Sequence, residues 1–128
     1  ETFPVASLTI ETKAGAQKIS VEVATTPKQY AQGLMYRREM ASDAGMVFVY
    51  QRAGKVSMWM KNTLIPLDMV FIDDSGKITK IVERTTPMSL DIISSGGPVR
   101  GVLELNGGTT SRLGVKAGDR VTLSGVFD

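Results

Sequence analysis

The chain has 128 residues and a formal net charge of +2, with 42% hydrophobic and 22% charged residues. A chain of this length buries roughly two-thirds of its unfolded surface, so one domain over residues 1–128 needs no disulfide or structural metal to fold. Cysteine and histidine are both absent. Their absence excludes cysteine-based zinc sites, thiol nucleophiles and every catalytic triad that uses histidine.

The basic residues are scattered, and the longest run of them is Arg37-Arg38. A nucleic-acid binder would gather them into a stripe interleaved with aromatic residues, so we expect no nucleic-acid partner. No apolar run approaches the ~20 residues that span a bilayer, and the first residues lack the basic and apolar regions of a signal peptide. The motifs "DDSG" and "NGGTTS" lack the spacing of a calcium loop and the lysine of a phosphate loop, so we expect neither a metal nor a cofactor.

Short apolar segments with alternating polar residues recur along the chain, which is typical of strands. The first such pair, residues 7–25, predicts a hairpin that turns at "KAGA". Its two arms carry apolar side chains at every second position. One face of this hairpin is therefore expected in the core.

A helix is predicted within residues 25–40. Thr26 can cap its first turn, Pro27 suits the first helical position, and Gln29 completes a capping box. Gly33 lowers helix stability by about 1 kcal/mol relative to alanine. We therefore expect either a short helix or a close approach of another backbone at this glycine.

Six further strands follow, and a tight turn at "DDSG" with Gly76 at positive φ joins two of them. A single helical turn is expected within residues 106–118. The fold class is therefore mainly β: a single-domain antiparallel β-sandwich or small barrel with one or two short helices. The predicted strands cover residues 45–51, 55–62, 67–73, 77–85, 100–106 and 119–127.

The segment "WMKNTLIPLDMVFID", residues 59–73, places polar groups in what otherwise reads as buried strand. In an extended strand Trp59 and Lys61 project to the same side. If Asp68 returns beside Lys61, an indole, an ammonium and a carboxylate line a pocket suited to a polar small molecule. The structural alternative is an ion pair between Lys61 and Asp68 that closes the turn, with Asn62 as its cap and Trp59 in the core.

The stretches "TPKQYAQGLMYRREM", "GMVFVY", "WMKNTLIPLDMVFIDDSGKI", "VLELNGG" and "GVKAGDRV" occur in this order. They resemble the successive motifs of an uncharacterised family of small bacterial and archaeal proteins, marked by a Trp-Met-Lys-Asn-Thr and Pro-Leu-Asp core. The resemblance runs from about Val21 to the C-terminus. It implies a mainly β fold and a periplasmic or envelope location, and it implies no established activity. The recurrent polar positions of the family fall on Arg37, Lys61, Asn62, Thr63, Asp68 and Glu104.

Two of these positions have structural alternatives. Arg37 can form a bidentate pair with Glu39 or with Glu104. The alternating segment "VLEL" makes Glu104 either an outward or a pocket-facing carboxylate.

Three functions are compatible with these residues. The first is a non-catalytic module that binds a small polar molecule or a carbohydrate, and the lack of a complete catalytic set favours it. The second is a hydrolase in which Asp68 and Glu104 act as base and acid at a separation of ~5 to 10 Å, with Lys61 tuning a pKa. The third is Cu(I) binding by methionine thioethers, although methionine is also a common core residue. The predicted ligand-binding residues are Arg37, Trp59, Lys61, Asn62, Thr63, Asp68 and Glu104.

Overall fold

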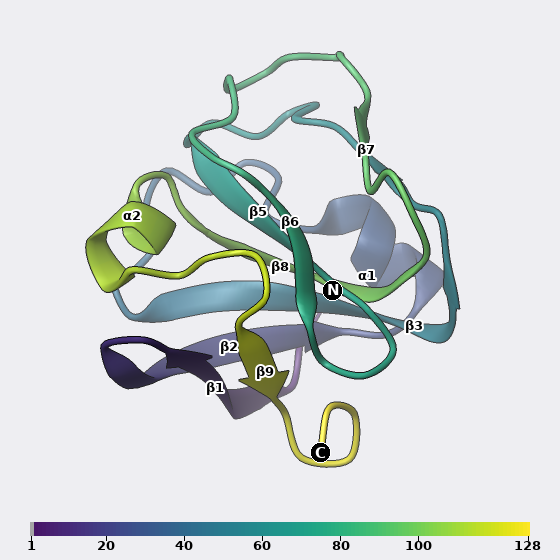
Figure 1. Ribbon diagram of the computed structural model, residues 1–128. Coiled ribbons are helices and arrows are strands. Elements are labelled where there is room, and N and C mark those ends of the chain that lie inside the picture. Colours follow the sequence, from purple (N-terminus) through teal and green to yellow (C-terminus); the bar gives the residue numbers. More distant parts are fainter. Residues whose placement is uncertain (1) are drawn as a thin grey trace.

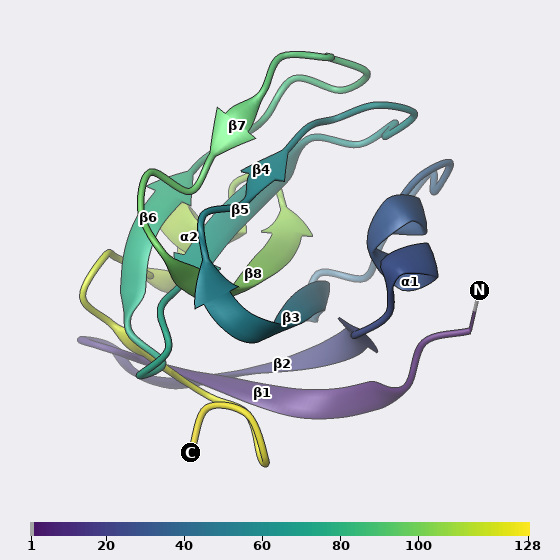
Figure 2. The same ribbon diagram turned by 90° about the vertical axis from the view of Figure 1, so that its right-hand side faces the viewer.

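The computed structural model describes residues 2–128 as a curled seven-stranded sheet, a half-barrel, with a two-stranded ribbon beside it (Figure 1, Figure 2). The predicted mainly β class is confirmed. The sheet has the strand order β6-β5-β8-β3-β2-β1-β9, and β4 pairs with β7. The elements are β1 (Val5–Thr12), β2 (Gly15–Ala24), α1 (Pro27–Gln32), β3 (Ala44–Gly54), β4 (Ser57–Met58), β5 (Leu67–Ile72), β6 (Ile78–Val82), β7 (Ile93–Ser94), β8 (Val99–Asn106), α2 (Thr109–Leu113) and β9 (Arg120–Thr122).

One strand pair departs from the predicted antiparallel pattern. The predicted hairpin is present as β1 and β2, but β2 and β3 are parallel. A parallel pair requires a crossover of a dozen or more residues, commonly containing a helix. Here α1 and the loop after it form that crossover. They return the chain to the end of the sheet from which β3 can run parallel to β2.

The helix α1 forms as its sequence predicts. The Thr26 hydroxyl accepts from the Gln29 backbone N–H, and the Gln29 side chain accepts from the Thr26 N–H, which completes the capping box. The helix ends at Gly33, and a Cβ there would lie 3.2 Å from Cζ of Phe48. The glycine therefore both shortens the helix and allows it to lie close against β3.

Backbone hydrogen bonds draw the two ends of the curled sheet together. The Ile78 N–H donates to the Asp119 carbonyl at 2.9 Å, and the Val121 N–H donates to the Gly76 carbonyl at 2.8 Å. Gly76 has a φ of +89°, as its predicted turn requires, and a Cβ there would lie 2.8 Å from the Val121 carbonyl oxygen. The apolar cluster inside the curl is thereby enclosed.

Each face of the central strands carries its own apolar cluster. On β5, Val70 and Ile72 join the cluster inside the curl, while Met69 and Phe71 join the cluster on the outer face. Every residue of β5 is buried. The segment that precedes β5 and the turn after α1 pack over the outer face, through Met60 and Leu34 among others.

The strand predicted at residues 55–62 was wrong for most of its length. Only Ser57–Met58 forms a strand, and the chain then turns, with the Thr63 N–H donating to the Met60 carbonyl at 3.1 Å. Asn62 adopts a φ of +54°, which ends any extended run. Within residues 2–128 the helices contain six and five residues, so no helix there is long enough to cross a bilayer.

Candidate functional site

A pocket of about 290 Å³ opens on the outer face of the sheet. Its walls come from three segments that are distant in sequence: α1 with the turn after it, the middle of β3, and the segment around β4. Its fourth contributor is Glu104 of β8. The lining side chains include Tyr30, Phe48, Tyr50, Met58, Trp59, Lys61, Thr63 and Glu104.

Glu104 lies on β8, an interior strand between β5 and β3, and borders this pocket. Its register partners are Met46 on β3 and Met69 on β5, both fully buried, and it is only 4% exposed itself. Over the described chain no hydrogen bond or ion pair reaches its carboxyl group. Among the described residues, every side-chain oxygen or nitrogen that is fully shielded from solvent has a hydrogen-bond partner. The Glu104 carboxyl oxygens have no such partner, so they must be open to the pocket.

Burial sets the ionisation of this carboxyl group. Desolvation among apolar neighbours raises the pKa of Glu104 to about 8. The group is therefore largely a neutral carboxylic acid at pH 7, able to donate one hydrogen bond and accept others. A cation placed beside it would favour the ionised form instead.

Two tyrosines, Tyr30 and Tyr50, line the pocket together with Glu104. The rings of Tyr30 and Tyr50 have centroids 4.9 Å apart, and Tyr30 also lies 6.4 Å from Phe48. The Tyr30 hydroxyl donates to the Val49 carbonyl, and burial raises its pKa. Burial and the nearby Glu104 raise the pKa of Tyr50, so both phenols stay neutral at pH 7.

Trp59, Lys61 and Thr63 also line the pocket, and the exposed Trp59 and Lys61 form its outer part. Trp59 is 44% exposed, and the Lys61 ammonium lies 5.2 Å from the centroid of its ring. Thr63 is buried, and its hydroxyl donates to the Lys61 carbonyl at 3.1 Å. The structure thus brings four of the predicted site residues to one pocket: these three and Glu104.

Arg37 lies outside this pocket and has a different partner from those expected. Its guanidinium forms a bidentate pair with Glu22 of β2, with one N–H···O distance of 2.8 Å, rather than with Glu39 or Glu104. Both side chains are about 30% exposed. The alternation of β2 gave no indication that Glu22, expected to face outward, would meet the turn after α1.

Asp68 is a structural anchor rather than a pocket residue. Its carboxylate accepts hydrogen bonds from the backbone N–H groups of Arg84, Gly108 and Thr110 and from the Thr110 hydroxyl, at 2.7 to 3.1 Å. Burial opposes its ionisation, but these hydrogen bonds outweigh the effect and lower its pKa. The expected ion pair with Lys61 is absent from the described chain. Asp68 instead ties β5 to the start of α2.

Asn62 is likewise a backbone element of the site and not part of its lining. Its positive φ allows the turn, and its carbonyl accepts from the Tyr36 N–H at 2.8 Å. Tyr36 itself has a φ of +66°. The contact connects the loop beside Trp59 to the turn after α1, and so holds two walls of the pocket together.

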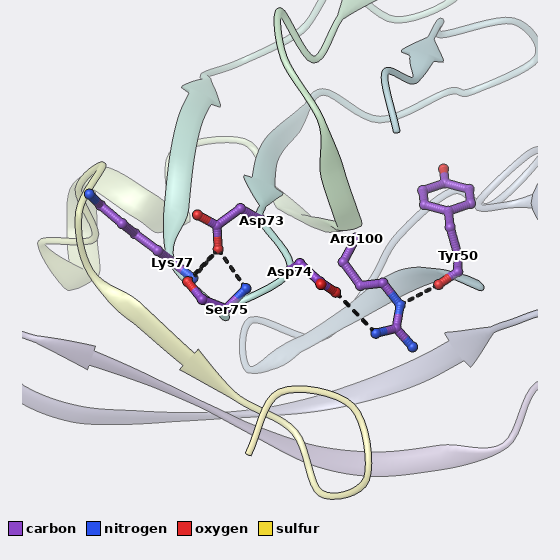
Figure 3. Close-up of polar contacts among 6 residues, drawn as sticks. All are labelled: Tyr50, Asp73, Asp74, Ser75, Lys77 and Arg100. Carbon is purple, nitrogen blue, oxygen red and sulfur yellow. Dashed lines mark hydrogen bonds and ion pairs between the residues drawn. The ribbon is translucent and has the colours of Figure 1, made fainter. Parts of the chain in front are cut away.

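Tyr30, Phe48 and Tyr50 were missed by the sequence analysis because they read as ordinary helix and strand residues. The backbone of Tyr50 is fixed by Arg100, whose Nε donates to the Tyr50 carbonyl while its Nη1 lies 3.3 Å from Asp74 (Figure 3). The ring of Tyr50 extends away from this contact (Figure 3). The pairing of β3 with β8 shifts between Val49 and Gly54, so Arg100 secures β3 where regular pairing is interrupted.

The fold and the pocket define a class: a small, mainly β protein with a buried carboxyl group at an aromatic-lined pocket. The chain belongs to the DUF192 family, described as "Uncharacterized ACR", which it matches over residues 9–123. The predicted membership of an uncharacterised family is thus confirmed.

Two solved structures are similar over most of the chain. A Sinorhizobium meliloti 1021 protein, named provisionally as a transcription regulator, is 47% identical with a TM-score of 0.95, over 98% of both chains. A protein of unknown function from Novosphingobium aromaticivorans DSM 12444 is 34% identical with a TM-score of 0.90, over 92% of this chain and 84% of the other. No curated protein matches the chain at a significant level.

Proposed function

We propose that this protein binds a small polar molecule in the pocket above Glu104 without transforming it. The single observation that carries the proposal is the Glu104 carboxyl group, which is nearly fully buried, faces the pocket and has no partner among the described residues. Carboxyl groups seldom lie among apolar side chains without polar partners, and the oxygens of this one are open to the pocket. A ligand in the pocket would contact this group directly.

The pocket has the dimensions and composition of a small-molecule site. Ligand pockets are commonly apolar hollows of ~300 Å³ or more with a few placed polar groups. This one, at about 290 Å³, suits a ligand the size of a monosaccharide or smaller. The exposed indole of Trp59 offers a stacking surface, and Lys61 offers a charge at the outer end.

Binding fits the geometry better than the two alternatives. The proposed acid and base of a hydrolase, Glu104 and Asp68, lie on opposite faces of the sheet, because Glu104 pairs with Met69 while Asp68 pairs with Leu105. The copper alternative gains no support, since two thioether sulfurs beside Trp59 already accept hydrogen bonds. Tyr50 donates to Sδ of Met58 at 3.8 Å, and Thr85 donates to Sδ of Met60 at 3.1 Å.

A thermal-shift screen tests the proposal. Sugars, amino acids, nucleotides and metal salts are screened against the parent protein, Lys61→Ala and the control Lys77→Ala, an exposed lysine outside the pocket. We expect at least one compound to raise the Tm of the parent and of Lys77→Ala, with a smaller shift in Lys61→Ala. No stabilising compound, or a shift of equal size in all three proteins, would reject this pocket.

An envelope location is part of the proposal and rests on the family resemblance of the motifs. The protein would then act as an accessory binding component outside the cytoplasm. Immunodetection in periplasmic and cytoplasmic fractions of the source organism tests this part. Detection only in the cytoplasmic fraction would remove the envelope role and leave the binding role intact.

A further inference from the structure

We propose, building on the binding function above, that the ligand is a small organic ammonium compound whose cationic group lies against Glu104 and the aromatic side chains around it.

The aromatic lining suits a cation. Tyr30, Phe48 and Tyr50 border the pocket, as does Trp59, whose ring already has the Lys61 ammonium 5.2 Å from its centroid. Cations are attracted to the faces of such rings, most strongly where water is excluded. The tyrosine hydroxyls are directed elsewhere, toward the Val49 carbonyl and Sδ of Met58. They are therefore poor donors for an anionic ligand, while the ring faces remain usable.

The charges around Glu104 leave room for one positive group. The titratable groups that border the pocket with it are Tyr30 of α1, Tyr50 of β3 and Lys61 of the loop after β4. The phenols are neutral at pH 7, and Lys61 is exposed and lies over Trp59 rather than paired with Glu104. An ammonium group of the ligand would therefore complement the charge of ionised Glu104 in the inner pocket.

Binding of such a ligand is coupled to a proton. The free protein holds Glu104 mainly as the acid at pH 7, because burial raises its pKa. A cation in contact favours the carboxylate, so the acid proton is released to solvent as the cation binds. Affinity for a cation consequently rises with pH toward and above 8, whereas affinity for a neutral ligand of the same shape does not.

Lys61 adds a preference at the other end of the ligand. Its exposed ammonium at the outer pocket repels a second cation and attracts a carboxylate. A zwitterion with its ammonium directed inward should therefore bind better than a simple cation. The gain should be lost in Lys61→Ala.

Calorimetric titration with two matched pairs of compounds tests the inference. Choline is compared with 3,3-dimethylbutan-1-ol, and glycine betaine with 3,3-dimethylbutanoate, since each pair differs mainly in a charged nitrogen in place of carbon. We expect both ammonium compounds to bind at least ten-fold more tightly than their carbon analogues, and Glu104→Gln to reduce that preference at least ten-fold. Titration at pH 7 is repeated in phosphate and in Tris. Because the buffer takes up the proton released on binding, the measured binding enthalpy should be more exothermic in Tris, which has the larger heat of protonation.

The outcomes separate this inference from the binding function itself. Equal binding of the carbon analogues, an undiminished preference in Glu104→Gln, or no binding of any of the four compounds would overturn the ammonium assignment. If a neutral sugar from the screen binds in a Trp59-dependent manner instead, the pocket function stands and only the assignment fails. If Glu104→Gln does not fold, choline affinity of the parent at pH 6 and pH 9 decides: an increase supports the assignment, and no change overturns it.

Discussion

Asp68 and Glu104 are one register position apart on adjacent strands, yet their carboxyl groups lie on opposite faces of the sheet. Asp68 pairs with Leu105 of β8, while Glu104 pairs with Met69 of β5. Directly opposed residues point to the same side, so a shift of one residue separates the two groups completely. Asp68 accepts four hydrogen bonds and has a lowered pKa, whereas Glu104 accepts none from the described residues and has a raised pKa.

Replacing Glu104 should change the pH dependence of stability. The pKa of Glu104 is about 8 in the native protein, above its ordinary value, so the native state binds more protons than the unfolded state between about pH 5 and pH 8. The free energy of unfolding therefore decreases as pH rises through this window, by up to about 1.4 kcal/mol per pH unit from this group.

In Glu104→Gln this decrease should be absent, because glutamine does not titrate. Urea unfolding of the parent and the variant at pH 5, 6, 7 and 8 measures the difference in slope. Glutamate and glutamine have nearly the same shape, so the packing against Met46 and Met69 is closely matched in the two proteins. Parallel stability curves for the two proteins would show that Glu104 ionises normally.

Asp68→Asn should reduce the free energy of unfolding by about 3 kcal/mol at pH 7. An amide NH2 in place of one carboxylate oxygen faces the N–H and hydroxyl donors of Thr110, so buried donors lose their acceptor. Since Asp68 has a lowered pKa, its contribution to stability is present at neutral pH and is lost as pH falls below about 4.

Chemical denaturation at pH 7 and pH 3 checks the Asp68 prediction. The deficit of the variant should be smaller at pH 3, below the ordinary pKa of aspartate, because the ionised Asp68 of the native state then contributes less to stability. Ligand affinity at pH 7 should be unchanged under conditions where the variant is folded. A loss of binding with full stability would instead place Asp68 in the binding site.

Arg37→Ala should lower the free energy of unfolding by less than about 1 kcal/mol, because both members of its pair with Glu22 are partly exposed. The side chain is not among those lining the pocket, so the dissociation constant of any compound from the screen should stay within a factor of two. Glu22→Ala is the matched control and should behave alike. Weaker binding in Arg37→Ala alone would restore Arg37 to the site.

Trp59→Ala should weaken ligand binding far more than it weakens the fold. The indole is 44% exposed, so its removal forfeits less burial than a core residue would, and we expect a loss of about 1 kcal/mol in unfolding free energy. Affinity should fall at least ten-fold, since one wall of the pocket is removed. Leu64→Ala, a neighbouring exposed residue that does not line the pocket, is the control. Equal affinity of the parent and Trp59→Ala would exclude the indole from binding.

The sequence was informative where a local signal exists. The capping residues Thr26 and Gln29 predicted the start of α1, Gly76 predicted a tight turn, and alternation predicted the hairpin of β1 and β2. Short-range hydrogen bonds and backbone preferences determine these features, so they can be read from a few adjacent residues. The strand at 55–62 was wrong because its extended pattern lacked a partner of matching length, and strands require pairing.

The sequence by itself determined a mainly β fold and predicted site residues that include Trp59, Lys61 and Glu104, which line one pocket in the structure. Only the tertiary structure decided which polar residues share a pocket. Asp68, nine residues from Trp59, is directed to the other face of the sheet, whereas Tyr30 and Tyr50 arrive from α1 and β3 to complete the lining. Pairing register determines the face on which each strand residue lies, and register depends on partners that are distant in sequence.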